Sequence, residues 1–231
     1  MKPMATDVLD KLTEIEAALI ALDPNELDQP DATLQERKSA QTRTRLLEAC
    51  VSCLANFGYA KTSTQLVAQT AKVSRGTMLH HYPMRIALIG AAIDFIELRR
   101  LRQFHDEIRK LTERERVLEG QGLEIYWRLM NTPESEAFLE LTLARRTDAQ
   151  LRRIFDQKTA RYDKVRTQLL PVAFPEWSMA SAEDFQLARD LITTTLTGLS
   201  LNHQAHDHKK RRIALRRFLF EAIQSLRQSD D

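Results

Sequence analysis

Apolar residues recur every three or four positions along most of this 231-residue chain, the spacing of a helix that buries one face. The first such segment covers residues 7 to 22, where the apolar positions form one seam on an otherwise acidic helix. Residues 23 to 36 contain two prolines and several acids, which predicts a linker. Alternating β-branched runs bounded by turn residues, the pattern of strands, are missing, so the sequence predicts an all-α protein.

The helical pattern resumes at residue 41 and predicts three short helices before residue 83. Gly58 ends the first, since glycine is the usual residue past a helix C-terminus. Ser63 or Thr64 can cap the second helix, and Ser74 can cap the third. Because a turn of about three or four residues joins the last two, the pattern is that of a helix-turn-helix.

Longer helices follow and are interrupted by a stretch with two prolines at residues 171 to 178. They are expected over residues 86 to 111, 115 to 130, 133 to 147, 148 to 170, 181 to 203 and 209 to 227. We therefore predict three parts: an N-terminal amphipathic helix with an acidic linker (1–40), a three-helix helix-turn-helix domain (41–85) and a larger antiparallel helical domain (86–231).

Charge is distributed unevenly although the net charge is only +2. Residues 1 to 35 hold two lysines and eight acids, a local charge of −6, whereas residues 36 to 85 hold eight Lys/Arg and two Glu, a local charge of +6. Basic charge confined to one segment is the footprint of a surface that meets phosphates.

Several classes of protein are disfavoured. No apolar run reaches the roughly 18 to 20 residues that span a bilayer, and the N-terminus has acids where a signal peptide has an apolar segment, so we expect a cytoplasmic protein without membrane contact. Cys50 and Cys53 are too close to staple a secreted fold and suit a helix core better than a redox or zinc pair. No catalytic triad order or Gly-rich phosphate loop is present, so we expect neither an enzyme nor a bound cofactor.

Histidines could suggest a metal site. His80 and His81 are adjacent, so on a helix they point about 100° apart, and no further ligand follows at helical spacing. His203, His206 and His208 are better spaced, but they stand in a polar stretch beside KKRR. We expect no metal at either place.

Residues 43 to 83, RTRLLEACVSCLANFGYAKTSTQLVAQTAKVSRGTMLHHYP, resemble the DNA-binding part of the tetracycline-repressor (TetR) type of transcriptional regulators. The shared features include Gly-Tyr after the first helix, Thr-Ser-Thr before the second and Val-Ser-Arg-Gly-Thr opening the third. The remainder of the chain matches that family only in the number and length of its helices. The resemblance implies a DNA-binding regulator.

The resemblance also implies which residues meet DNA. The helix from Ser74 to Tyr82 would lie in the major groove, with Thr64 and Gln65 of the preceding helix, and Arg85 after it, on phosphates. The groove-facing residues would be Arg75, Gly76, Thr77, Leu79, His80 and His81. Their chemistry fits, because Arg can bind guanine O6 and N7 and a Thr methyl can contact thymine.

Four positions depart from the family pattern. Lys72 stands where a turn glycine is preferred, and a left-handed lysine there costs about 1 kcal/mol. Leu79 replaces a tyrosine, Met84 replaces a capping Ser or Thr, and Arg85 replaces a lysine. These changes concern the operator sequence and the affinity for it.

The C-terminal part is expected to form a homodimer and to hold a small hydrophobic or amphipathic ligand. The expected dimer residues are Thr195, Gly198, Leu199, Phe218, Leu219, Ala222, Ile223 and Leu226. The large residues of the middle helices that could line a pocket or simply fill the core are Trp127, Met130, Phe138, Phe155 and Tyr162. A two-fold dimer predicts a palindromic operator in double-stranded DNA, from which the ligand releases a repressor. The alternative is a helical interaction protein or a regulator without a pocket.

Overall fold

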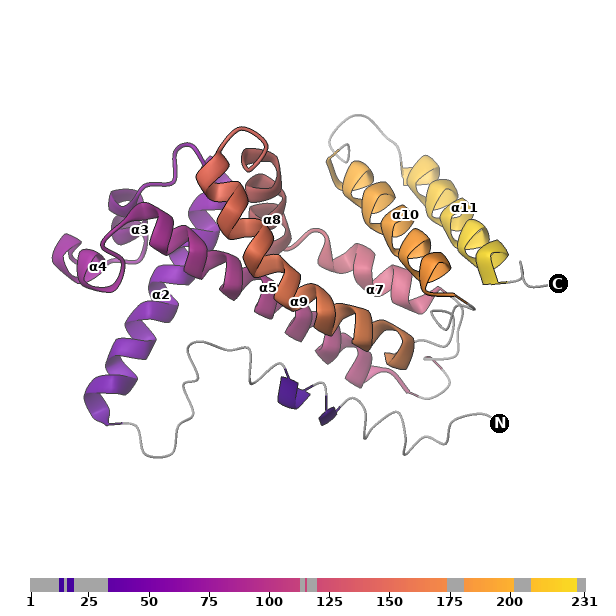
Figure 1. Cartoon of the computed structure of the whole chain (residues 1–231), viewed down its shortest axis with the longest axis horizontal. Helices are drawn as coiled ribbons and strands as arrows, with labels where there is room; N and C mark the ends of the chain where they lie inside the picture. Colours follow the sequence, from indigo (N-terminus) through magenta and orange to yellow (C-terminus); the bar gives the residue numbers. More distant parts are fainter. Residues whose placement is uncertain are drawn as a thin grey trace. The chain divides into compact units, whose positions relative to one another are not determined.

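The computed structural model describes residues 13–14, 16–18, 33–112, 115, 120–173, 181–201 and 209–227, and all regular structure in these ranges is helical (Figure 1). The helices are α2 (Leu34–Phe57), α3 (Thr64–Thr70), α4 (Arg75–His81), α5 (Arg85–Lys110), α7 (Gln121–Leu129), α8 (Pro133–Ala144), α9 (Ala149–Ala173), α10 (Ala182–Leu201) and α11 (Lys209–Arg227). The all-α prediction is confirmed. Most of the predicted helix over 7 to 22 lies outside the described residues, as do His203, His206 and His208.

Helix α2 begins at Leu34, seven residues before the predicted start at 41. The backbone N–H of Glu36 donates to Thr33 Oγ1 (3.3 Å), and the Thr33 N–H donates back to Glu36 Oε2 (2.7 Å), which is a complete capping box. The predicted linker is therefore wrong over residues 34 to 36. The prolines and acids of residues 23 to 36 indicated a linker, although Thr33 and Glu36 have the Thr-x-x-Glu spacing of a capping box.

Two further predicted boundaries differ from the structure. The expected helix over 115 to 130 is interrupted, because Gly120 has a left-handed backbone (φ +82°) and α7 starts after it. Helix α9 continues to Ala173 although Pro171 was expected to end it. A proline this near a helix end removes only one helical hydrogen bond. The remaining helices agree with the prediction to within about three residues.

The chain forms two compact units. The first comprises residues 14–103 and 132–166, and the second comprises residues 1–13, 104–131 and 167–231. The division between them crosses α5 and α9. The functional boundary that the sequence suggests at residue 85 stays a prediction.

In the first unit, the helix-turn-helix shares one core with α5, α8 and the start of α9. Its fully buried side chains come from all of these elements and include Leu46, Cys50, Val67, Met78, Ile89, Leu141 and Leu151. Cys50 and Cys53 are buried free thiols, so the interpretation of Cys50 as a core residue is confirmed. Because the helix-turn-helix has no core separate from that of α8 and α9, a change in those helices reaches it through packing.

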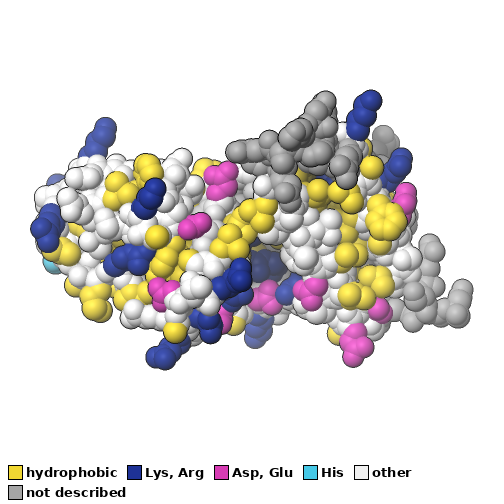
Figure 2. All heavy atoms as spheres, turned by 90° about the horizontal axis from the view of Figure 1, so that it is seen from above, with side chains coloured by type: hydrophobic (Ala, Val, Ile, Leu, Met, Phe, Trp, Pro, Cys, Tyr) yellow, Lys and Arg dark blue, Asp and Glu magenta, His cyan; other side chains and the backbone are white. Residues whose placement is uncertain are grey.

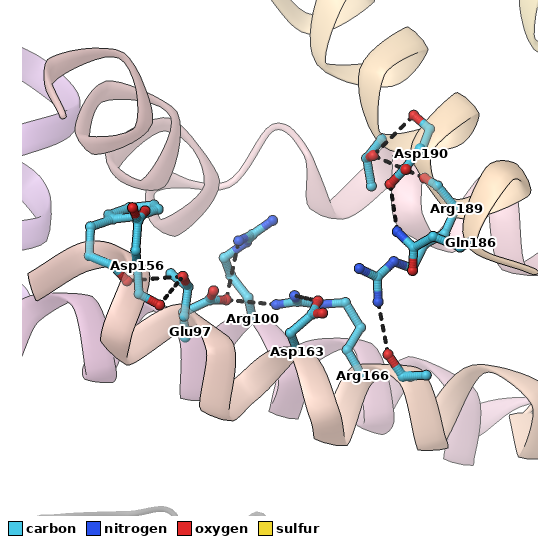
Figure 3. Close-up of polar contacts among 12 residues, drawn as sticks. Glu97, Arg100, Asp156, Asp163, Arg166, Gln186, Arg189 and Asp190 are labelled. Atoms are coloured by element: carbon cyan, nitrogen blue, oxygen red, sulfur yellow. Dashed lines mark hydrogen bonds and ion pairs between the residues drawn. The ribbon is translucent and has the colours of Figure 1, made fainter. Parts of the chain in front are cut away.

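Buried charges join α5 to α9 in this unit. Asp94 pairs with Lys158 and accepts a hydrogen bond from the Tyr162 hydroxyl (3.2 Å). One turn further on, the fully buried Glu97 accepts a hydrogen bond from Arg166 (2.7 Å), which reaches it from the facing helix (Figure 3). These pairs fix the register of the two helices.

The second unit contains α7, α10 and α11. Helices α10 and α11 pack against each other, and Ile192, Leu196, Leu219 and Ile223 are buried. Arg216 of α11 donates to Glu124 of α7 (2.8 Å). Across both units, none of the helices described is long and apolar enough to cross a membrane.

Candidate nucleic-acid interface

Hydroxyl caps set the starts of both helix-turn-helix elements. Ser63 Oγ accepts from the backbone N–H of Leu66 (3.1 Å), so Ser63 rather than Thr64 caps α3. Ser74 Oγ accepts from the N–H of Thr77 (3.0 Å), which confirms the predicted cap of α4. Each cap satisfies an N–H group that has no partner within its helix.

The turn between α3 and α4 contains a left-handed lysine. Lys72 has φ +54°, and no other non-glycine residue among those described has a positive φ. Arg45 of α2 holds this turn, because its Nη2 donates to the carbonyl of Ala71 (2.8 Å) and more distantly to that of Lys72 (3.4 Å). The departure from glycine that the sequence revealed therefore falls on a position where glycine has a physical advantage.

Helix α4 turns a mixed polar and apolar face to solvent. Met78 anchors the helix in the core with 1% of its surface exposed, and Thr77 is half-buried. The exposed residues are Ser74, Arg75, Gly76, Leu79 and His80. At Gly76 an added Cβ would meet nothing closer than Ser74 Oγ at 3.8 Å, so the backbone itself is accessible. Five of the predicted DNA-binding residues thus share one surface.

The last two predicted residues of this helix are less accessible. His81 is half-buried, and burial lowers its pKa, with the charges of His80 and Arg43 adding to the effect. The lowered pKa favours the neutral form of His81. Tyr82 is 8% exposed, and burial raises its pKa to about 12, so its hydroxyl stays protonated.

The residues predicted to hold phosphates differ in what they already contact. Thr64 is half-buried and Gln65 exposed at the start of α3. Arg85 instead donates through Nε to the carbonyl of Thr62 (2.7 Å) and through Nη2 to that of Tyr59. Its guanidinium also lies 4.1 Å above the Tyr59 ring. Much of its donor capacity is committed inside the protein.

Tyr59 connects the turn after α2 to the long helices. Its backbone N–H donates to Glu140 of α8 (2.7 Å), and its hydroxyl donates to Asp148, the residue before α9 (2.7 Å). Gly58 permits this approach, since a Cβ there would lie 3.0 Å from Glu140 Oε1 and the backbone has φ +80°. We call Tyr59, Arg85, Glu140 and Asp148 the Tyr59 joint.

Sequence reasoning missed the Tyr59 joint. Its two bonds from Tyr59 span 81 and 89 residues of chain, and no local spacing reveals such pairs. In the sequence, the Gly-Tyr dipeptide stands out only as part of a resemblance. Arg45, which holds the turn before α4, was missed for the same reason.

The candidate pocket residues are divided between the two units. Phe138 and Phe155 stack at 5.2 Å between ring centroids, and Phe155 belongs to the core under the helix-turn-helix. Tyr162 is fully buried against Asp94. In the other unit, Met130 is buried and Trp127 lies 5.4 Å beneath the Arg216 guanidinium.

The candidate dimer residues also divide. Leu219 and Ile223 are buried within their own subunit, whereas Phe218 is 69% exposed. A Cβ added at Gly198 would meet no atom within 4 Å, so this part of α10 is open. The half-buried members of the set are Thr195, Leu199, Ala222 and Leu226.

Comparison with known proteins gives a consistent result. Residues 46–92 match the family model described as bacterial regulatory proteins, tetR family. An HTH-type transcriptional regulator of Mycobacterium tuberculosis is 23% identical over 175 residues, which cover 74% of this chain and 86% of that protein.

Two solved structures share the fold. The multidrug binding protein EbrR, complexed with imidazole, superposes with a TM-score of 0.57 and 19% identity over 80% of this chain and 93% of that one. NalD of Pseudomonas aeruginosa, described as the secondary repressor of the MexAB-OprM multidrug efflux pump, has a TM-score of 0.54 and 18% identity over 84% of this chain and 100% of that one.

Proposed function

Because the chain belongs to the TetR family of transcriptional regulators, which bind DNA and are not enzymes, we propose that it is a cytoplasmic repressor released from its operator by a small ligand. The observation that carries the proposal is the exposed face of α4, anchored by Met78 and capped by Ser74. Residues 41–85 make the DNA contacts in this proposal, and residues 86–231 dimerise and bind the ligand.

Specific contacts with bases come from the exposed face of α4. Arg75 is exposed at its first position, where a guanidinium can bind guanine O6 and N7. Leu79 is 37% exposed and offers an apolar contact to a thymine methyl, in place of the hydroxyl that a tyrosine would bring. Thr64 and Gln65 at the start of α3 contact phosphates.

Dimerisation is supported by apolar side chains that the subunit leaves uncovered. In the second unit, those at least 45% exposed are Leu187, Leu201, Ile213, Leu215 and Phe218. Figure 2 shows hydrophobic side chains gathered on this part of the surface. Pairing α10 and α11 with their copies about a two-fold axis covers such residues. To bind successive major grooves, the two α4 helices of such a dimer must lie about 34–36 Å apart, one turn of DNA. The operator is then palindromic.

For a ligand to release the DNA, its binding to residues 86–231 must change the position of α4. The Tyr59 joint provides a connection through which this can happen. It ties the turn between α2 and α3 to α5, α8 and α9 through the bonds of Tyr59 and Arg85. A ligand that shifts those helices changes the position of the turn, and linkage requires that it weaken DNA binding, typically by about 1–3 kcal/mol. The description of EbrR as a multidrug binding protein favours a hydrophobic or amphipathic ligand.

Selection of bound sequences from a random duplex pool tests the DNA-binding part of the proposal. The full chain is expected to enrich a palindrome with half-sites about 10 base pairs apart. Replacing Arg75→Ala and His80→Ala removes two exposed contacts and should abolish the enrichment, while Arg153→Ala on α9, also exposed, should preserve it. Enrichment of the same sequence by the Arg75/His80 variant would show that α4 does not recognise the bases.

Reciprocity tests the ligand. A compound that weakens operator binding by a given factor must itself bind less tightly, by the same factor, to the protein–operator complex. Calorimetric titration of amphipathic compounds with and without operator DNA measures both. A compound that binds with high affinity and leaves operator affinity unchanged would favour a regulator without a coupled pocket.

A further inference from the structure

Half of the basic residues that give residues 36–85 their positive charge lie on the first half of α2, before α3 and α4. They are Arg37, Lys38, Arg43 and Arg45, out of eight Lys/Arg in that segment. Residues 33 to 50 contain these four basic residues and two acids, Glu36 and Glu48, and Glu48 pairs with Arg99 of α5 (2.6 Å). The beginning of α2 is therefore a concentrated positive surface.

These turns contribute little to the core. Residues 34 to 38 are exposed, Ala40 is buried, and the continuous run of core positions starts only at Leu46. Figure 1 shows the first half of α2 projecting beyond α3 and α4 at the same end of the unit. The capping box nevertheless holds this projecting helix in shape. Packing alone does not account for an ordered, basic and exposed helix start.

Three of the four basic residues are aligned along one face, whereas the half-buried Arg43 lies on the side of Leu47. Lys38, Gln41 and Arg45 follow at helical spacing, are all exposed, and stand opposite the buried positions Leu47 and Cys50. We call Arg37, Lys38, Gln41 and Arg45 the α2 stripe. Its inner end is fixed, because Arg45 donates to the carbonyl of Ala71 in the turn that leads into α4 (2.8 Å). Lys38 lies about 10 Å further out along the helix axis.

We propose that the α2 stripe is a second DNA-contact surface, which binds phosphates of the DNA backbone flanking the base pairs that α4 contacts. Phosphates are chosen as the partner because the stripe is cationic and continuous with the turn before α4. The first residues of a recognition helix enter the groove, so the turn before it lies beside the backbone. Arg37 and Lys38 are the new phosphate-binding residues, and Arg45 positions the stripe. The proposal rests on the DNA binding proposed above.

Binding to phosphates is independent of sequence and depends strongly on salt. The test compares the wild-type full chain with Arg37→Gln/Lys38→Gln on a long random-sequence duplex between about 50 and 200 mM salt. The slope of log affinity against log salt should fall in magnitude by about 0.9 for each phosphate that the variant no longer binds. Glutamine is a good helix former, and circular dichroism checks that α2 is retained.

A matched variant controls for net charge. Arg153→Gln/Lys164→Gln removes the same charge from exposed positions of α9 and should leave the slope unchanged. On a short duplex that ends at the selected half-sites, wild type and Arg37→Gln/Lys38→Gln should bind equally, because the flanking phosphates are gone. The sequence selected from a random pool should also be unchanged.

The outcomes separate the two proposals. An unchanged slope for Arg37→Gln/Lys38→Gln, or an equal decrease in the α9 control, would overturn the α2 stripe and leave the role of α4 intact. Equal weakening on short and long duplexes would also overturn it, since the phosphates bound by Arg37 and Lys38 would then lie within the half-sites. If the wild-type chain binds no duplex at all, the proposed DNA-binding function itself fails.

Discussion

Several basic residues near α4 have structural roles that their residue type does not reveal. Lys72 adopts a left-handed conformation in the turn before α4. The Arg45 side chain holds this turn by donating a hydrogen bond to the carbonyl of Ala71. Arg85, which looks like a phosphate-binding residue in the sequence, lies on the Tyr59 ring and binds two backbone carbonyls. A charged side chain near a DNA-binding helix can therefore be structural.

Replacing Lys72→Gly should stabilise the protein. A left-handed lysine is strained, whereas glycine adopts the same backbone freely, although its greater freedom in the unfolded chain offsets part of the gain. The free energy of unfolding in urea should rise by about 0.5–1 kcal/mol. Lys164→Gly, inside α9, should instead lower it by about 1 kcal/mol. A decrease in the stability of Lys72→Gly would mean that the lysine side chain makes an interaction worth more than the strain.

Asp148 should make stability depend on pH. The N–H of Leu151 and, secondarily, the hydroxyl of Tyr59 hold the pKa of Asp148 below its usual value. The folded chain then binds the proton more weakly than the unfolded chain, so stability falls as the pH falls. This contribution is complete above about pH 3.9, the ordinary pKa of Asp, and disappears as the pH drops through the lowered value.

Urea unfolding of wild type and Asp148→Asn measures this effect. The difference in unfolding free energy should be largest near pH 7 and should shrink below about pH 3.9. Tyr59→Phe removes only the second cause and should reduce the pH dependence without abolishing it. A difference that is the same at both pH values would show that the charge of Asp148 is irrelevant.

At the scale of helices, α5 and α9 are held in register by buried charge. Glu97 is fully buried and accepts hydrogen bonds from Arg166 (2.7 Å) and Arg100 (3.4 Å). Because α5 begins at Arg85 and α9 follows Asp148, both helices reach the Tyr59 joint. Their register therefore bears on the position of the helix-turn-helix.

Glu97→Gln should be strongly destabilising. The substitution removes the fully buried partner of Arg166, which keeps the more exposed Asp163 (3.3 Å), so the free energy of unfolding in urea should fall by at most about 3 kcal/mol. Glu107→Gln breaks an Arg–Glu pair of similar length (2.8 Å) and a second pair with Lys110 (2.7 Å). Because Arg128 and Lys110 are 58% and 69% exposed, the decrease should be below about 1 kcal/mol. Equal decreases in the two variants would mean that burial does not decide the strength of the Glu97 pair.

At the scale of the whole molecule, five of the ten exposed large apolar side chains among the described residues lie on α10 and α11. Phe218 is the most exposed large apolar residue of these helices at 69%. The sequence marked this helix for dimerisation, but the buried Leu219 and Ile223 serve its packing in the subunit. The proposed interface is therefore carried by the neighbouring positions.

Phe218→Glu tests the proposed dimer and should convert it into a folded monomer. A charge at the centre of an apolar interface would lose its hydration on association, whereas in the monomer it stays in water. Sedimentation should show half the mass, and operator binding should fall with it. Leu143→Glu, an exposed apolar position on α8, is the matched control and should leave the mass unchanged. A Phe218→Glu protein that remains dimeric would place the interface elsewhere.

The sequence by itself determined most of the helices, the cap of α4 and the position of the strained turn. These features depend on residues three or four apart, such as Ser74 and Thr77, whose spacing is visible in the chain. The Thr33–Glu36 capping box is also visible as a local spacing, but the prolines and acids around it favoured a linker. Sequence reasoning therefore predicted the helix α4, whose role in DNA recognition is part of the proposed function.

Only the tertiary structure decided how that face is supported. Arg45 reaches a carbonyl 26 residues away, and Tyr59 reaches carboxylates 81 and 89 residues away. A local pattern cannot specify such pairs, because their closeness arises from the packing of α2, α5, α8 and α9 around one core. The sequence also cannot tell whether an apolar residue such as Phe155 lines a pocket or fills the core. In the structure, Phe155 packs in the core of the first unit.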